Sequence, residues 1–148
     1  MTKFLVLLED SQESTVAIRF AAHRAARAGA SVTVLAVIHA EDIAHGLGVA
    51  EVMRAEAREQ IEAHYEVYAG WMRDRVQVAS ELVIREGDPA AELLALVGTD
   101  EDVSIVILGI GSQAGAVATR LMREVSAMPC ALTFVPAALS PERLDAIS

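Results

Sequence analysis

The sequence contains a single cysteine, so no disulfide can form within the chain. It has no apolar run long enough to cross a bilayer, because its longest runs have only the length of a β-strand. The first residues, Met1-Thr2-Lys3-Phe4, lead directly into an apolar run and lack the basic region and cleavage site of a signal peptide. We therefore expect a cytoplasmic protein with no membrane partner.

Positive charge is also scarce. Lys and Arg together number 12 against 21 Asp and Glu, the formal net charge is −9, and Lys3 is the only lysine. Binding to a nucleic-acid backbone requires many cations, so this composition argues against a nucleic-acid partner. An anionic ligand would have to be held locally, by backbone amides and one or two arginines. The acidic surface most simply serves solubility.

Aromatic residues make up only 4% of a chain that is 53% hydrophobic. Much of the apolar content is alanine, which favours helices that pack closely on a flat surface. Five apolar or β-branched runs alternate with segments of helical periodicity. The predicted strands are 4–8, 31–38, 81–84, 103–108 and 130–135, and the predicted helices are 15–28, 49–76, a short one from 89, and 116–127.

This alternation predicts a three-layer αβα architecture, in which helices cover both faces of a five-stranded parallel sheet with right-handed crossovers. The chain shows no internal repeat and no linker. Its 148 residues suit one domain with one core, so we expect a single domain over residues 1–148. Residues 136–148 form a C-terminal tail, in which Ser140 could cap one more helical turn.

A glycine-rich stretch follows the fourth predicted strand, where residues 107–119 read I-L-G-I-G-S-Q-A-G-A-V-A-T. Its glycines are Gly109, Gly111 and Gly115. The glycines and the next helix could bind an anion through backbone amides, with hydroxyls from Ser112 and Thr119 and a charge from Arg120. Alternatively, the stretch is a tight turn that needs glycine at positive φ. It lacks the G-K-[ST] ending of a P-loop, and the sequence alone favours the turn.

The first predicted strand ends in an acidic turn, Glu9-Asp10-Ser11. Ligands of open parallel sheets lie beyond the carboxyl ends of the strands, where the strand order reverses. If the first strand is central, this turn and the glycine-rich stretch flank one crevice. Asp10 could cap the following helix together with Glu13, and Glu9 or Asp10 could bind a ribose hydroxyl. Both roles could hold at once.

Other reactive side chains give weaker signals. His39 and His45 share a loop with acidic residues, but their spacing matches no metal-ligand motif, so we expect a mobile polar loop. Cys130 begins a predicted buried strand and is interpreted as a small apolar core residue. Tyr68 and Trp71 are interpreted as packing residues. No spacing supports a Ser/His/Asp or Cys/His nucleophile, so the sequence does not indicate an enzyme.

Four stretches together resemble the universal stress protein family, in order and in spacing. They are Leu8–Ser14, Glu86–Pro89, Gly109–Thr119 and Pro129-Cys130. The resemblance covers Lys3 to Val135. It implies an adenine nucleotide α-hydrolase-like fold with strand order 3-2-1-4-5 and a homodimer formed through the last strand, here Cys130 to Val135. Some members of this family bind ATP or AMP, and members usually act as regulators in the stress response.

The glycine-rich stretch departs from the family pattern G-x2-G-x9-G-[ST]. Ser112 stands where the second glycine is expected, Ala118 stands where the third is expected, and the stretch is shorter. Thr119 fits the final hydroxyl. These departures affect the part of the site that would hold a triphosphate.

The residues expected to contact adenosine match the family pattern more closely than those expected to contact a triphosphate. Glu9 replaces the usual aspartate and could still reach a ribose, and backbone groups of Val37 and Ile38 would contact adenine. The resemblance therefore implies a degenerate adenine-nucleotide site that tolerates AMP or adenosine better than ATP. Two alternatives stay open. One is an ATP-binding protein with slow hydrolysis, and the other is a nucleotide-independent dimeric interaction module that uses the fifth strand and the tail.

Overall fold

The computed structural model describes residues 1–43, 46 and 48–148 of the chain. The strands are β1 (Lys3–Leu7), β2 (Ser31–His39), β3 (Ser80–Gly87), β4 (Val103–Ile110) and β5 (Ala131–Pro136). The helices are α1 (Gln12–Ala28), α2 (Val49–Trp71), α3 (Pro89–Thr99), α4 (Ala116–Glu124) and α5 (Pro141–Ile147). Short helical turns cover Ala40–Asp42, Met72–Val76 and Val125–Ala127.

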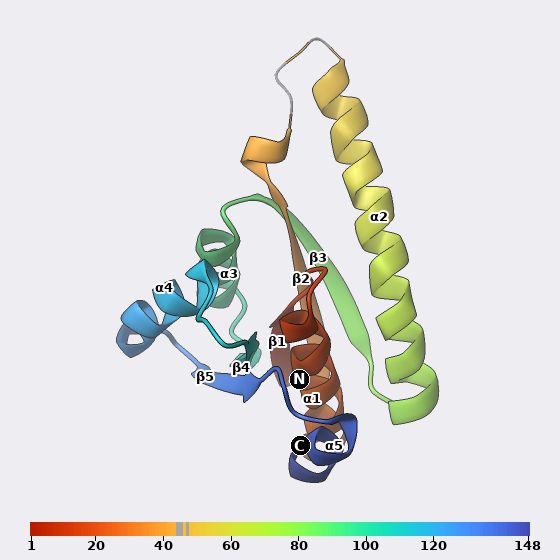
Figure 1. Ribbon diagram of the computed structural model, residues 1–148, viewed down its shortest axis with the longest axis vertical. Coiled ribbons are helices and arrows are strands. Elements are labelled where there is room, and N and C mark those ends of the chain that lie inside the picture. Colours follow the sequence, from red (N-terminus) through yellow and green to blue (C-terminus); the bar gives the residue numbers. More distant parts are fainter. Residues whose placement is uncertain (44–45, 47) are drawn as a thin grey trace.

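The five strands form one parallel sheet in the order β3-β2-β1-β4-β5, which confirms the predicted topology. Helices α1, α2 and α5 cover one face of the sheet, and α3 and α4 cover the other (Figure 1). Strand β1 lies between β2 and β4, so the strand order reverses at β1. The crevice that the sequence predicts therefore opens at the carboxyl ends of β1 and β4.

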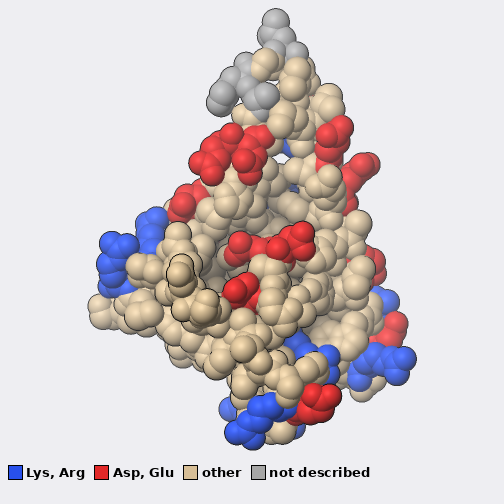
Figure 2. Space-filling model, in the orientation of Figure 1, with Lys and Arg blue, Asp and Glu red and all other residues tan. Residues whose placement is uncertain are grey.

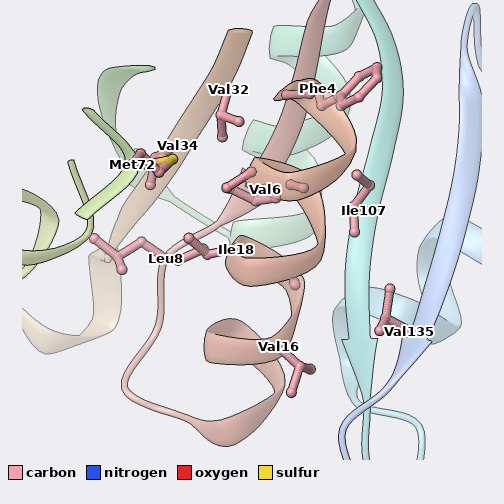
Figure 3. Close-up of a cluster of buried hydrophobic side chains, with 14 of the residues drawn as sticks. Phe4, Val6, Leu8, Val16, Ile18, Val32, Val34, Met72, Ile107 and Val135 are labelled. Atoms are coloured by element: carbon pink, nitrogen blue, oxygen red, sulfur yellow. The ribbon is translucent and has the colours of Figure 1, made fainter. Parts of the chain in front are cut away.

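Buried side chains fill both faces of the sheet, as expected for parallel strands covered by helices. On the α1 face, Phe4, Val6, Val32 and Val34 meet a stripe of small residues on α1 (Figure 3). The alanines of this stripe are Ala17, Ala21, Ala22 and Ala25, all 2% exposed or less. Their small side chains bring α1 close to the sheet, which explains how a chain so poor in aromatics forms a dense core.

The first helix begins earlier than predicted and has a different N-cap. It starts at Gln12, and the side chain of Ser11 accepts a hydrogen bond from the backbone N–H of Ser14 at 3.1 Å. The interpretation of Asp10 as the N-cap is therefore wrong. Ser11 adopts the extended backbone conformation of an N-cap, with φ −155° and ψ 158°.

The glycine-rich stretch is not a positive-φ turn, so that interpretation is also wrong. Among the described glycines, only Gly29, Gly48 and Gly87 have φ values in the left-handed region. Strand β4 instead continues through Gly109, where a Cβ atom would overlap the backbone carbonyl of Glu13. Glycine is needed at position 109 because the first turn of α1 packs directly on the end of β4.

The C-terminal tail is an integral part of the fold. Ser140 caps α5, as predicted, by accepting a hydrogen bond from the N–H of Arg143. Leu144 is 1% exposed and joins the core cluster on the α1 face. Arg19 of α1 donates two hydrogen bonds of 2.7 Å to the carboxylate of Asp145, which fixes α5 on α1.

Candidate functional site: the crevice between β1 and β4

Ser14 builds the turn that carries the acidic residues after β1. Its hydroxyl donates to the carbonyl of Leu7 at 2.9 Å and accepts from the N–H of Glu9 at 3.0 Å, and the side chain is buried. With the cap from Ser11, these bonds satisfy backbone groups that the end of β1 and the start of α1 leave open. The sequence analysis included Ser14 only as the last residue of the Leu8–Ser14 stretch that resembles the family, and not as a site residue.

The larger of two cavities at this edge of the sheet has a volume of about 680 Å³. It lies between the turn after β1 and the glycine-rich stretch after β4. Six of the predicted site residues line it: Glu9, Ser11, Gly109, Gly111, Gly115 and Arg120. The structure therefore brings together the acidic turn and the glycines, which are about 100 residues apart in the sequence.

A second cavity of about 380 Å³ lies beside the first, under helix α2. Asp10, Val37 and Ile38 line it, together with apolar side chains of α2 such as Met53 and Ile61. The side chains of Glu9 and His39 border both cavities. The residues predicted to contact adenine are thus adjacent to those predicted to contact ribose, but on the α2 side of the crevice.

Two predicted site residues lie apart from this arrangement. Ser112 and Thr119 are exposed, and neither lines one of the two cavities. Ser112 stands where the family pattern has a glycine, whereas Thr119 fits the final hydroxyl of that pattern. Of the residues expected to contact phosphate, Gly109, Gly111, Gly115 and Arg120 therefore line the larger cavity, whereas these two hydroxyls do not.

Arg120 is engaged in two ion pairs at the mouth of the larger cavity. Its Nε donates to Glu124 at 2.8 Å, and its Nη1 donates to Asp88 at 3.4 Å. The hydrogen bond to Glu124, followed by the charges of Glu124 and Asp88, raises the pKa of the guanidinium above its ordinary value. Asp88 also caps α3 by accepting from the N–H of Ala91 at 2.9 Å. The charge of Arg120 is thus largely balanced by neighbouring carboxylates.

Acidic groups outnumber basic groups around the larger cavity. Its carboxylates are Glu9, Glu13, Glu41 and Asp88, and its guanidinium groups are Arg120 and Arg123. Figure 2 shows acidic side chains around the hollow on the face that it draws, with most basic side chains at the periphery. Sequence reasoning named Glu13 only as a helix-capping partner, and it missed Glu41 and Asp88 as cavity residues because their positions depend on the three-dimensional arrangement of the loops.

Outside these two cavities, the reactive side chains of the described residues form no metal-type cluster. His39 lies 4.0 Å from Glu41, whereas His45 falls outside the described residues. Within the described part of the chain, no three His, Cys, Asp or Glu side chains are grouped as metal ligands. Cys130 is half-buried just before β5, and burial raises the pKa of its thiol. Tyr68 and Trp71 pack against the core, as predicted.

Solved structures share this architecture. A universal stress protein family member from Burkholderia pseudomallei is 22% identical, with a TM-score of 0.70 over 91% of this chain and 96% of that chain. The hypothetical protein MJ0577 is 18% identical, with a TM-score of 0.74 over 94% and 98%. A universal stress protein in complex with cAMP is 15% identical, with a TM-score of 0.65 over 93% and 98%. Because these sequence identities are low, the structural similarity shows that the fold is shared.

Three further findings concern this chain. No curated protein matches it. No helix in residues 1–43, 46 and 48–148 combines the length and the apolar character that a bilayer span requires. The profile described as the universal stress protein family matches residues 1–127, most of the chain. The sheet order and the crevice agree with this match. The chain therefore belongs to the universal stress protein family.

Proposed function

We propose that this protein is a regulatory module of the stress-response type, with a degenerate adenine-nucleotide site that favours adenosine or AMP over ATP. The observation that carries the proposal is the shared cavity, in which Glu9 from the end of β1 faces the glycines that follow β4. A carboxylate at this position can accept hydrogen bonds from ribose hydroxyls. The related protein solved with cAMP supports an adenine nucleotide as the ligand class.

The preference for fewer phosphates follows from charge. The larger cavity has four carboxylates and two guanidinium groups, and Arg120 is already paired with Glu124 and Asp88. Each added phosphate brings more negative charge into this acidic setting, and the shortened glycine-rich stretch offers few amides to offset it.

Calorimetric titration of nucleotide-free protein tests this function. AMP or adenosine should bind more tightly than ATP, with or without Mg²⁺, and Glu9→Ala should weaken AMP binding. Tight ATP binding that requires Mg²⁺ would overturn the proposed preference. Release of phosphate from ATP above background would support the slow-hydrolysis alternative instead.

We also propose a cytoplasmic homodimer that pairs through β5, including the residues Cys130 to Val135. Among the described residues, β5 is an edge of the sheet and pairs with β4 alone, so its outer backbone groups are open to a second strand. The tail is less suited to partner binding, because Leu144 and Ser148 are buried against the rest of the chain.

A charge on the edge strand tests the dimer. Ala131→Lys places a cation on an exposed position of β5, so light scattering should report a monomer. Ala55→Lys makes the same change on an exposed position of α2 and should leave the dimer intact. A wild-type monomer, or a dimer that survives Ala131→Lys, would contradict pairing through β5.

A further inference from the structure

The side chain of Glu13 lies over the glycine-rich stretch. Glu13 is in the first turn of α1, and its Oε1 occupies the space that a Cβ atom at Gly111 would need. Its backbone packs on Gly109 in the same way. A single residue of α1 therefore covers two of the three glycines that would present their backbone to a phosphate.

The Glu13 carboxylate also has no basic partner. Among the described residues, no hydrogen bond or ion pair reaches it, although it is half-buried and lines the larger cavity. Its position at the N-terminus of α1 stabilises the negative charge through the helix dipole. A negative charge held at this place repels a phosphate that approaches the backbone of Gly109 and Gly111.

We infer that Glu13 is the residue that sets how many phosphates the site accepts. Its carboxylate occupies the space over Gly111 in which a phosphate would bind. A ligand with an extended phosphate chain must therefore displace this carboxylate or be repelled by it. Adenosine would not reach this subsite, and AMP would meet it less than ATP. This inference rests on the proposed function for the placement of the nucleoside, but the competition with phosphate is a property of Glu13 itself.

Glu13→Gln tests the inference because it removes the charge and keeps the size of the side chain. Calorimetry at low ionic strength, where charges are least screened, compares adenosine, ATP and inorganic tripolyphosphate. ATP and tripolyphosphate should bind the variant about tenfold more tightly than the wild type. Adenosine affinity should be unchanged. Glu101→Gln, which removes an exposed carboxylate in the turn before β4, is the matched control and should behave as wild type.

The outcomes of these titrations distinguish the role of Glu13 from the proposed function. Equal affinity of the wild type and Glu13→Gln for both ATP and tripolyphosphate, including no binding to either protein, would overturn the role of Glu13. An equal gain in Glu101→Gln would also overturn it, because net charge would then explain the effect. Absence of adenosine binding to any of the proteins would contradict the proposed function, while tripolyphosphate still tests Glu13. If Glu13→Gln does not fold, Glu13→Ala replaces it in the same comparison.

Discussion

At the scale of single residues, small side chains determine the geometry of the site. Ser14 ties the end of β1 to the start of α1 through hydrogen bonds to Leu7 and Glu9. Gly109 allows the first turn of α1 to pack on β4. These contacts hold Glu9 and Glu13 at the mouth of the crevice. The positions of these two carboxylates therefore depend on Ser14 and Gly109, which are uncharged.

The helix cap gives a prediction at this scale. Ser11→Ala removes the side-chain oxygen that accepts from the N–H of Ser14, so it should lower the free energy of unfolding by about 1 kcal/mol. Asp10→Ala should change it by less than about 0.5 kcal/mol, because Asp10 is exposed and does not cap α1. Chemical denaturation measures both. A larger loss for Asp10→Ala than for Ser11→Ala would restore Asp10 as the cap.

At the scale of elements, α5 is held against the rest of the fold by the buried side chain of Leu144 and by the contacts of Asp145. Leu144 enters the core, and the Asp145 carboxylate accepts two hydrogen bonds from Arg19 and lies 3.2 Å from Nε2 of His23. The hydrogen bonds from Arg19, followed by the nearby charges, hold the pKa of Asp145 below its ordinary value. The ionised form of Asp145 is therefore favoured in the folded state.

The variant Asp145→Asn should show how much this ion pair contributes to stability, because the difference in stability from the wild type should depend on pH. Because the pKa of Asp145 is lower in the folded state, the pair stabilises the protein above the ordinary pKa of aspartate and is lost as the pH falls through the depressed value. Both side chains are about one-third exposed, so the variant should be less stable at pH 7 by only about 0.5–1 kcal/mol. Thermal unfolding from pH 7 down to pH 3 should show the two proteins converge. A difference that grows on acidification would contradict this role.

At the scale of the whole molecule, the alternation of apolar runs and helical periodicity was enough to predict a parallel sheet covered on both faces. The strand order came from the family resemblance, because periodicity does not say which strands are neighbours. Strand ends were less predictable, since β4 continues into glycines that sequence propensity assigns to a turn.

The site was predictable only in part. The crevice follows from the reversal of strand order, so Glu9 and Gly109 could be placed together before the fold was known. The roles of Glu13 and Asp88 could not, because they depend on how the start of α1 and the start of α3 face the cavity. The pairing of Arg120 with Glu124 could be expected from their i, i+4 spacing on one helix, whereas the pairing with Asp88 depends on how α3 and α4 are placed.

The proposed function depends on the binding of AMP in the crevice between β1 and β4. Its most direct test is a titration of isotope-labelled protein with AMP, followed by the backbone amide resonances. The resonances of Glu9, Ser11, Gly109 and Gly111 should shift together and saturate at one affinity, while those of β3 at its amino end stay in place. Binding that leaves these four resonances unmoved, or no binding of AMP at all, would contradict the claim.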